Sequence, residues 1–150
     1  MISCILAVPC GHLKLTEENG FITACDWTEE APFPAETALL KKAEKELKEY
    51  FKGKRKTFDL PVQPKGTAFE KDVWSVLEKI PYGHLMTYGE IAREIGRPKA
   101  SRAVGNACGR NPVCIIIPCH RVVGKNNDGG YSNGMKYKYA LWKEEGIERK

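Results

Sequence analysis

The sequence lacks the features of a membrane-embedded or secreted protein. Nowhere in its 150 residues is there a run close to the ~18 consecutive apolar residues that a membrane-spanning helix needs. The first residues, MISCILAV, have no basic lead and no long apolar core, so they are a poor signal peptide and are more typical of a first strand. These absences predict a cytoplasmic protein, or a nuclear one if the source is a eukaryote.

Paired cysteine spacings are also missing. None of the six cysteines forms a Cys-x-x-Cys pair, which argues against a zinc ribbon or a thioredoxin-type motif, and we expect reduced thiols. Cys4, Cys10, His12 and Cys25 could gather around a metal on neighbouring strands. Small buried side chains are the favoured interpretation, so we expect no metal site. The cysteines are Cys4, Cys10, Cys25, Cys108, Cys114 and Cys119.

Acidic residues are absent from one long stretch of the chain. Residues 1–65 hold ten basic and ten acidic residues, whereas residues 66–150 hold fourteen and nine, so the net charge of +5 lies in the second half. Between Arg97 and Lys125 there are six basic residues and no acidic one. A basic surface without counter-charge favours a polyanionic partner over a merely solvated face.

Residues 1–60 are predicted to form a small α/β domain in which an antiparallel sheet packs with one helix. Apolar residues recur at helical spacing over residues 36–51, on a face formed by Leu40, Ala43, Leu47 and Phe51. The proline-containing segment 61–66 is the predicted linker. The predicted strands are Ile2–Val8, His12–Leu15, Phe21–Asp26 and a short one at Phe58–Leu60.

Residues 67–150 are predicted to form a mainly helical second domain. Thr67 and Thr87 each stand three residues before a glutamate, which is the capping box of a helix start. A third helix is expected from Lys99 to about Cys108, with Pro98 in its first turn. The second and third helices then resemble a helix-turn-helix whose recognition helix has small side chains apart from Arg102. Close packing against another helix or entry into a DNA groove would both suit such a surface.

The most informative stretch is IIIPCHRVV, residues 115–123. A buried strand over Val113–Ile117 is predicted to deliver Cys119, and nearby positive charge favours the nucleophilic thiolate. His120 follows directly, but neighbours on a strand point to opposite faces, so a contact with Cys119 needs a turn or a bridging water. A carboxylate should orient the histidine. The nearest candidates are Asp128, Glu144 and Glu145.

The segment Pro118–Val123 resembles the active-site motif of the O6-alkylguanine-DNA alkyltransferases, the methylated-DNA–protein-cysteine methyltransferases. The resemblance covers residues 66–147 in detail, and residues 1–60 resemble the variable N-terminal domain of that family only loosely. It is carried further by TYGEIA at 87–92, RAVG at 102–105, NPV at 111–113, GGYS at 129–132 and EG at 145–146. Asn133 departs from the family pattern, which usually has a small residue there.

The resemblance implies DNA repair by direct reversal. An alkyl group, usually methyl, would pass irreversibly and once per molecule from O6-alkylguanine, and also from O4-alkylthymine, in duplex DNA to Cys119 after base flipping. No cofactor is implied, the partner is double-stranded DNA containing O6-alkylguanine, and the protein would act as a monomer without a membrane. One alternative is a non-catalytic alkyltransferase-like lesion binder, but such relatives lack the nucleophilic cysteine. A Cys-His hydrolase would leave the basic stretch unexplained.

The resemblance also implies site roles. Cys119 accepts the alkyl group, and His120, held by Glu145, keeps it as thiolate through a water. Tyr88 donates to N3 of the flipped base, and Lys138 assists the leaving group and lines the pocket. The implied catalytic residues are Cys119, His120, Glu145, Tyr88, Asn111, which braces a turn, and Lys138. Those for DNA are Arg102, which enters the base stack, Ser101, Ala103, Gly105, Thr87, Arg110 and Arg121. Those for the base are Tyr88, Val122 through its carbonyl, Ser132 through its N–H, Tyr131 and Met135.

Overall fold

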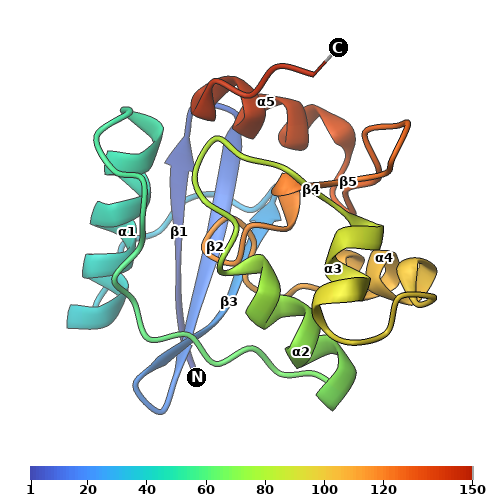
Figure 1. Cartoon of the computed structure of the whole chain (residues 1–150). Helices are drawn as coiled ribbons and strands as arrows, with labels where there is room; N and C mark the ends of the chain where they lie inside the picture. Colours follow the sequence, from blue (N-terminus) through green and yellow to red (C-terminus); the bar gives the residue numbers. More distant parts are fainter. Residues whose placement is uncertain (150) are drawn as a thin grey trace. The chain divides into compact units, whose positions relative to one another are not determined.

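The computed structural model describes residues 1–149, which form two compact units (Figure 1). The first comprises residues 1–65, and the second begins at Gly66. In the described part of the chain, no helix is both long and apolar enough to cross a membrane.

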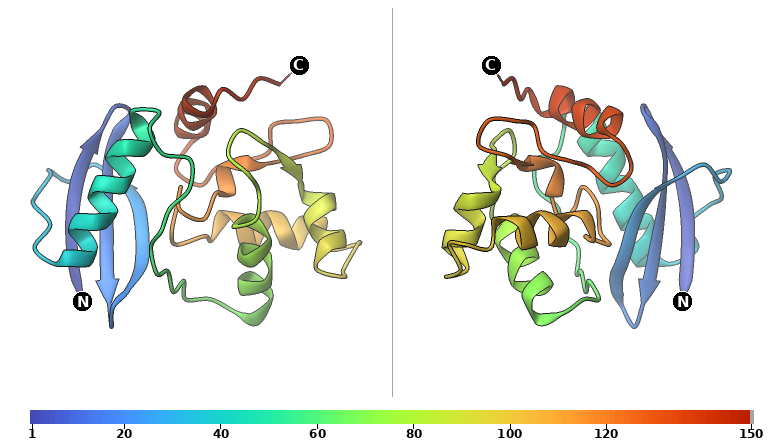
Figure 2. Two further views of the ribbon diagram at one scale, coloured as in Figure 1. Left: turned by 60° about the vertical axis from the view of Figure 1, so that its left-hand side comes forward. Right: turned by 90° about the vertical axis from the view of Figure 1, so that its right-hand side faces the viewer.

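The first unit is a three-stranded antiparallel sheet with one helix on one of its faces (Figure 2). Strands β1 (Ile2–Val8), β2 (Gly11–Glu18) and β3 (Phe21–Thr28) lie in the order β1-β2-β3, and helix α1 spans Ala38–Phe51. The three predicted strands are confirmed, although β2 and β3 are longer than expected. Since residues of α1 such as Leu40, Ala43 and Leu47 are fully buried, this helix closes the core of the unit.

Two details of the first unit differ from the sequence prediction. Phe58–Leu60 is not a strand; instead Val62, in the predicted linker, forms a parallel bridge with Ile22 of β3. The Gln63 N–H donates to the Ile22 carbonyl at 2.9 Å, so the start of the proline segment extends the sheet edge. On α1, Tyr50 rather than Phe51 is fully buried, because helical geometry places Tyr50 nearer the stripe of Ala43 and Leu47.

The second unit is mainly helical, and its two predicted capping boxes are present. Helices α2 (Ala68–Leu77) and α3 (Tyr88–Glu94) begin after Thr67 and Thr87, and each threonine Oγ1 accepts the N–H three residues on at 3.1 Å. Each box is closed by its glutamate, which accepts the threonine N–H at 2.9 Å. Two more helices are α4 (Ser101–Gly109) and α5 (Met135–Glu145).

Helix α4 begins later than predicted. The Ala100 N–H donates to the Arg97 carbonyl at 2.9 Å, so Pro98 and Lys99 lie in a turn before the helix. Residues 95–100 thus join α3 to α4. The buried Trp74 of α2 donates its indole N–H to the Ala107 carbonyl of α4 at 2.9 Å and ties these helices together.

The predicted strand over Val113–Ile117 is absent. Ile115 has a φ of +71°, and the Ile116 N–H donates to the Cys114 carbonyl at 2.8 Å, so the chain makes a tight turn there. A β-branched residue in this conformation costs about 1–3 kcal/mol and persists only where its surroundings impose it. The prediction was wrong because three isoleucines in a row favour a strand locally, whereas the fold requires a reversal.

After this turn, a short 3-10 helix η1 (Cys119–Arg121) leads into strand β5 (Val122–Val123). β5 pairs in parallel with β4 (Met86–Thr87), which immediately precedes α3. This pairing brings the start of α3 to the segment that carries Cys119, although the two are more than thirty residues apart in sequence.

Candidate active site

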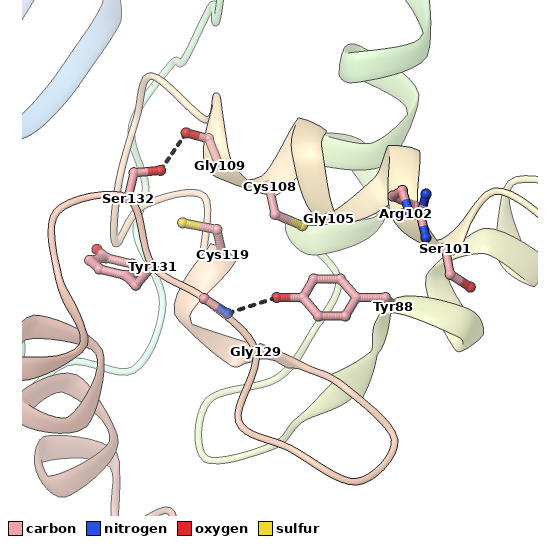
Figure 3. Close-up of a pocket in the computed structure, with 11 residues that line it drawn as sticks. Tyr88, Ser101, Arg102, Gly105, Cys108, Gly109, Cys119, Gly129, Tyr131 and Ser132 are labelled. Carbon is pink, nitrogen blue, oxygen red and sulfur yellow. Dashed lines mark hydrogen bonds between the residues drawn. The ribbon is translucent and has the colours of Figure 1, made fainter.

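A cavity of about 500 Å³ in the second unit collects most of the chemically notable residues. Its walls come from α3, α4, η1 and the loop before α5 (Figure 3). This volume lies in the range of small-molecule sites. The lining residues are Tyr88, Ser101, Arg102, Gly105, Cys108, Gly109, Cys119, Gly129, Gly130, Tyr131 and Ser132.

Cys119 is the first residue of η1 and only 7% exposed. A hydrogen bond from the Cys114 thiol is the largest influence that lowers the pKa of Cys119; burial opposes it, and Asn111 and Lys138 reinforce it. The net lowering favours the thiolate, which is the nucleophilic form. The cavity wall therefore carries an activated sulfur.

His120 and Glu145 form a fully buried pair behind Cys119. The His120 Nε2 lies 2.6 Å from Glu145 Oε2, and because a carboxylate only accepts, Nε2 carries the hydrogen. Burial lowers the pKa of His120, with a smaller opposing effect of Glu145, so the imidazole is neutral at pH 7. Its other nitrogen, Nδ1, is then an acceptor, and this buried atom has no hydrogen-bond partner among the described protein atoms.

Arg121 is buried, so the expectation that it contacts DNA is wrong. It is 6% exposed, and its Nε and Nη2 donate to the two Glu145 oxygens at 2.8 and 3.0 Å, while Nη1 donates to the Ile80 carbonyl at 2.7 Å. The Gly83 N–H adds a further bond to Glu145 Oε1 at 2.9 Å. Arg121 is buried because its guanidinium neutralises and orients the carboxylate that holds His120.

Tyr88, the first residue of α3, extends into the cavity. Its hydroxyl oxygen accepts the Gly130 N–H at 3.2 Å (Figure 3). Burial raises the pKa of Tyr88, so the side chain remains a phenol, and its own hydrogen can be donated to a ligand. The tyrosine also restricts the loop opposite. Gly129 has a φ of +70°, and a Cβ atom there would collide with the Tyr88 hydroxyl.

Lys138 of α5 has a different place from the one expected. It is fully buried and is not among the lining residues of the cavity. Its Nζ donates to the carbonyls of Val122 at 2.7 Å, Asp128 at 2.7 Å and Gly130 at 2.9 Å, which uses all three ammonium hydrogens. Desolvation lowers its pKa to about 8. Lys138 therefore clamps the loop 124–130, and the expectation that it lines the pocket is wrong.

Asn111 has the geometry expected of a brace. Its Nδ2 donates to the Ile117 carbonyl at 2.7 Å, and its Oδ1 accepts the Val113 N–H at 3.0 Å, across the tight turn before Cys119. Ser132 holds the opposite wall, because its hydroxyl donates to the Gly109 carbonyl at the end of α4 at 2.5 Å. Tyr131 lines the cavity as expected, whereas Met135 does not.

The residues expected to contact DNA are distributed around α4. Ser101, Arg102 and Gly105 line the cavity from this helix, while Ala103 is exposed on it. Thr87 caps α3, and its hydroxyl is engaged in the capping box. Arg110, which is exposed, pairs with Glu70 at 3.4 Å, so part of its charge is compensated.

Sequence reasoning missed several residues that shape the site. Cys108 and Gly109 line the cavity from α4, and Gly129 is needed for its conformation. The Arg149 guanidinium donates to the carbonyls of Asn127, Gly124 and Lys125 and adds a second clamp on the loop 124–130. Adjacent glycines at 129–130 were a readable signal, whereas the role of Arg149 depends on tertiary contact alone.

The possible metal cluster in the first unit gains no support. Across residues 1–149, no three His, Cys, Asp or Glu side chains are grouped so as to hold a metal ion. Cys4 and Cys25 are fully buried in the sheet, and burial raises the pKa of the Cys4 thiol to about 11.

Both units match domains of one known protein family. Residues 68–147 match the family described as "6-O-methylguanine DNA methyltransferase, DNA binding domain", and residues 2–64 match its ribonuclease-like domain.

Individual relatives agree with these matches. A methylated-DNA–protein-cysteine methyltransferase of Methanosarcina acetivorans is 50% identical over 121 residues, which is 80% of this chain and 74% of that protein. The protein of the same name from Haemophilus influenzae is 40% identical over 148 residues, covering 93% of this chain and 83% of the relative. The crystal structure of Mycobacterium tuberculosis OGT in complex with DNA has a TM-score of 0.84 and 37% identity, covering 95% of this chain and 91% of that one.

The placement of Arg121 generates a prediction that separates a structural role from DNA contact. Arg121→Met should lower the free energy of unfolding by about 3–5 kcal/mol, because it leaves the buried Glu145 carboxylate without its cation. Urea denaturation measures the change. The matched control is Lys125→Met, which removes an exposed cation four residues away and should cost less than about 0.5 kcal/mol. Wild-type stability combined with weaker DNA binding in Arg121→Met would contradict the buried role.

Proposed function

Because the chain belongs to the 6-O-methylguanine DNA methyltransferase family, which repairs DNA by alkyl transfer, we propose that Cys119 itself takes the alkyl group from O6-alkylguanine in duplex DNA, once per protein molecule. The observation that carries this proposal is the activated, buried Cys119 at the wall of a cavity that is also lined by α4. A non-catalytic lesion binder would not need such a sulfur.

The reaction is an in-line displacement at the alkyl carbon. The Cys119 sulfur forms a bond to this carbon while the bond from carbon to O6 breaks, and guanine leaves with the electron pair. Tyr88 is the donor for the leaving base, because its phenol keeps a hydrogen of its own while it accepts the Gly130 N–H. Lys138 is not that donor, since its three hydrogens are bound to carbonyls. It supports the reaction by holding the loop of Gly129 and Gly130.

His120 removes the proton of Cys119. Its buried Nδ1 is the free acceptor of a neutral imidazole, and one water between Nδ1 and the Cys119 sulfur would relay the proton. The imidazolium formed in this way is stabilised by Glu145 at 2.6 Å. Guanine takes up one proton on leaving, so the protons balance. The product is a thioether, which water does not readily cleave, and the protein is consumed in a single turnover.

DNA recognition is assigned to α4 and the basic residues around it. An alkyl group on O6 is inaccessible in the stack, so the base must flip out, at a cost of a few kcal/mol. Arg102 is exposed, lines the cavity and would fill the vacated space. The small side chains of α4 permit close approach to the minor groove. Exposed cations such as Arg97, Lys99 and Lys125 would meet phosphates, which makes binding salt-sensitive and largely independent of sequence.

We further propose that the protein acts on DNA as a monomer, because every side chain assigned to the reaction comes from the second unit of one chain. Its DNA substrate would locate it in the cytoplasm, or in the nucleus of a eukaryotic cell. The chemistry described needs no cofactor, since the chain supplies the nucleophile, the base and the hydrogen-bond donor.

The direct test is transfer of labelled methyl from O6-methylguanine DNA. Intact mass and peptide mapping should find one added methylene per protein, on Cys119. Cys119→Ala should keep DNA binding and lose transfer completely, because no other sulfur is both activated and at the cavity wall. Methyl transfer that persists in Cys119→Ala would refute the assignment.

Two adjacent glycines provide a matched pair of variants for the cavity. Gly129→Ala should reduce transfer at least about tenfold, because its Cβ displaces the Tyr88 hydroxyl and strains a positive φ. Gly130→Ala should retain nearly wild-type rates, since a Cβ there meets nothing within 4 Å. Single-turnover rates on O6-methylguanine DNA measure both. Equal rates for the two variants would remove Tyr88 from the reaction.

Arg102 is tested by comparing two substrates. Arg102→Ala should slow repair of duplex DNA by at least about tenfold, because nothing fills the vacated stack. Its reaction with free O6-benzylguanine should change less than twofold or so, since that base is already unstacked. Equal losses on both substrates would argue against a role in base flipping. Lys125→Ala, which removes an exposed cation away from the lining of the cavity, controls for the loss of a phosphate contact and should slow duplex repair far less than Arg102→Ala.

A further inference from the structure

We propose that Cys114 is a positioning residue for alkyl transfer, whose thiol donates a hydrogen bond to the Cys119 sulfur and holds it as an anion facing the cavity. This inference rests on the proposed function of Cys119. It assigns a task to a second thiol, for which the sequence alone predicts only the reduced state.

The tight turn brings the two cysteines together. Cys114 and Cys119 are 4% and 7% exposed, and they flank the reversal at Ile115. Cys114 forms a bridge with Ile117, whose carbonyl in turn accepts the Cys119 N–H at 2.9 Å. In the strand expected from the sequence, residues 114 and 119 would be far apart. The strained turn thus has a consequence for the chemistry, because it folds the first thiol back toward the second.

The Cys114 hydrogen has two acceptors within reach. One is the Asn111 carbonyl, at 4.0 Å from the Cys114 Sγ, which is the outer limit for a hydrogen bond to or from sulfur. The other is the Cys119 sulfur, whose pKa the hydrogen bond from Cys114 lowers more than any other group does. Because a thiolate is a stronger acceptor than a distant carbonyl, the hydrogen should point to Cys119 once Cys119 ionises.

Asn111 is a second side-chain donor to Cys119, and the backbone N–H of Cys119 itself is a third, weaker one. One of its amide hydrogens is given to the Ile117 carbonyl at 2.7 Å, and the amide also donates to the Cys119 sulfur. The same side chain therefore braces the turn and contacts the anion. Cys114 and Asn111, both from the residues just before the turn, approach Cys119 as a pair.

The other groups around Cys119 do not replace these donors. Lys138 of α5 contributes only its charge, because its hydrogens are bound to carbonyls, and His120 is neutral. From α4, Cys108 remains a neutral thiol because burial raises its pKa to about 12, and from α3, Tyr88 remains a neutral phenol. Burial itself disfavours the Cys119 anion. Loss of the Cys114 donor should therefore raise the pKa of Cys119.

The test compares Cys114→Ala with Cys114→Ser in the full chain. The rate of reaction of Cys119 with free O6-benzylguanine is measured between pH 5.5 and 9.5, so that DNA binding plays no part. Cys114→Ala should shift the profile toward higher pH by up to about one unit, which slows the reaction up to about tenfold at pH 6. The two rates should converge within about twofold at high pH, where Cys119 is ionised in both proteins.

Serine is the decisive comparison because it keeps a donor. Cys114→Ser should restore most of the wild-type profile, and Cys10→Ala, which removes a thiol of the first unit, should leave it unchanged. A packing defect would instead lower the plateau in both Cys114 variants without moving the profile, and circular dichroism and urea denaturation would show it. That result, or superimposable pH profiles for Cys114→Ala and wild type, would overturn the proposal.

Failure of this inference is distinguishable from failure of the proposed function. If wild type transfers methyl to Cys119 but the profile of Cys114→Ala is not shifted, only the role of Cys114 is lost. If wild type shows no transfer at any pH, both proposals fail together.

Discussion

The buried carboxylate of Glu145 is the interaction on which the rest of the site depends. It receives hydrogen bonds from His120 and from two nitrogens of Arg121, both in η1, and from the Gly83 N–H in the segment between α2 and β4. Buried ion pairs often add little net stability, because desolvation offsets the Coulombic gain. The contribution of the Glu145–Arg121 ion pair is to the geometry of the site. It fixes the ring and tautomer of His120 and leaves Nδ1 as the acceptor.

The cavity is shaped by backbone as much as by side chains. Lys138 and Arg149 donate hydrogen bonds to carbonyls of the loop 124–130, which carries Gly129. The Tyr88 hydroxyl accepts the Gly130 N–H of the same loop. Both clamps bind carbonyl oxygens, so the carbonyls are drawn back and the Gly130 N–H faces Tyr88. This arrangement explains why long basic side chains in a DNA-repair protein need not contact DNA: Arg121, Lys138 and Arg149 are used internally.

Errors of the sequence prediction share a physical cause. Val113–Ile117 has a local preference for a strand, but the fold imposes a reversal at Ile115, which propensity cannot anticipate. The family resemblance implied a DNA contact for Arg121, which lies in an uncompensated basic stretch. Its partner is Glu145, 24 residues away in sequence, and only the fold brings the two charges together. Capping boxes at Thr67 and Thr87 were predictable, since they are local.

By itself, the sequence determined the local features: three short strands, the starts of α2 and α3, Cys119 as the candidate nucleophile and, through its motifs, the family. These depend on periodicity, capping and residue order within a few positions. Tertiary structure decided which groups meet. It placed Glu145 against His120, as the family resemblance implied, buried Arg121 and Lys138, and folded Cys114 back toward Cys119. Burial explains these contacts, because a charged or polar group that is removed from water costs free energy unless it is paired, and its partner often comes from a distant part of the sequence.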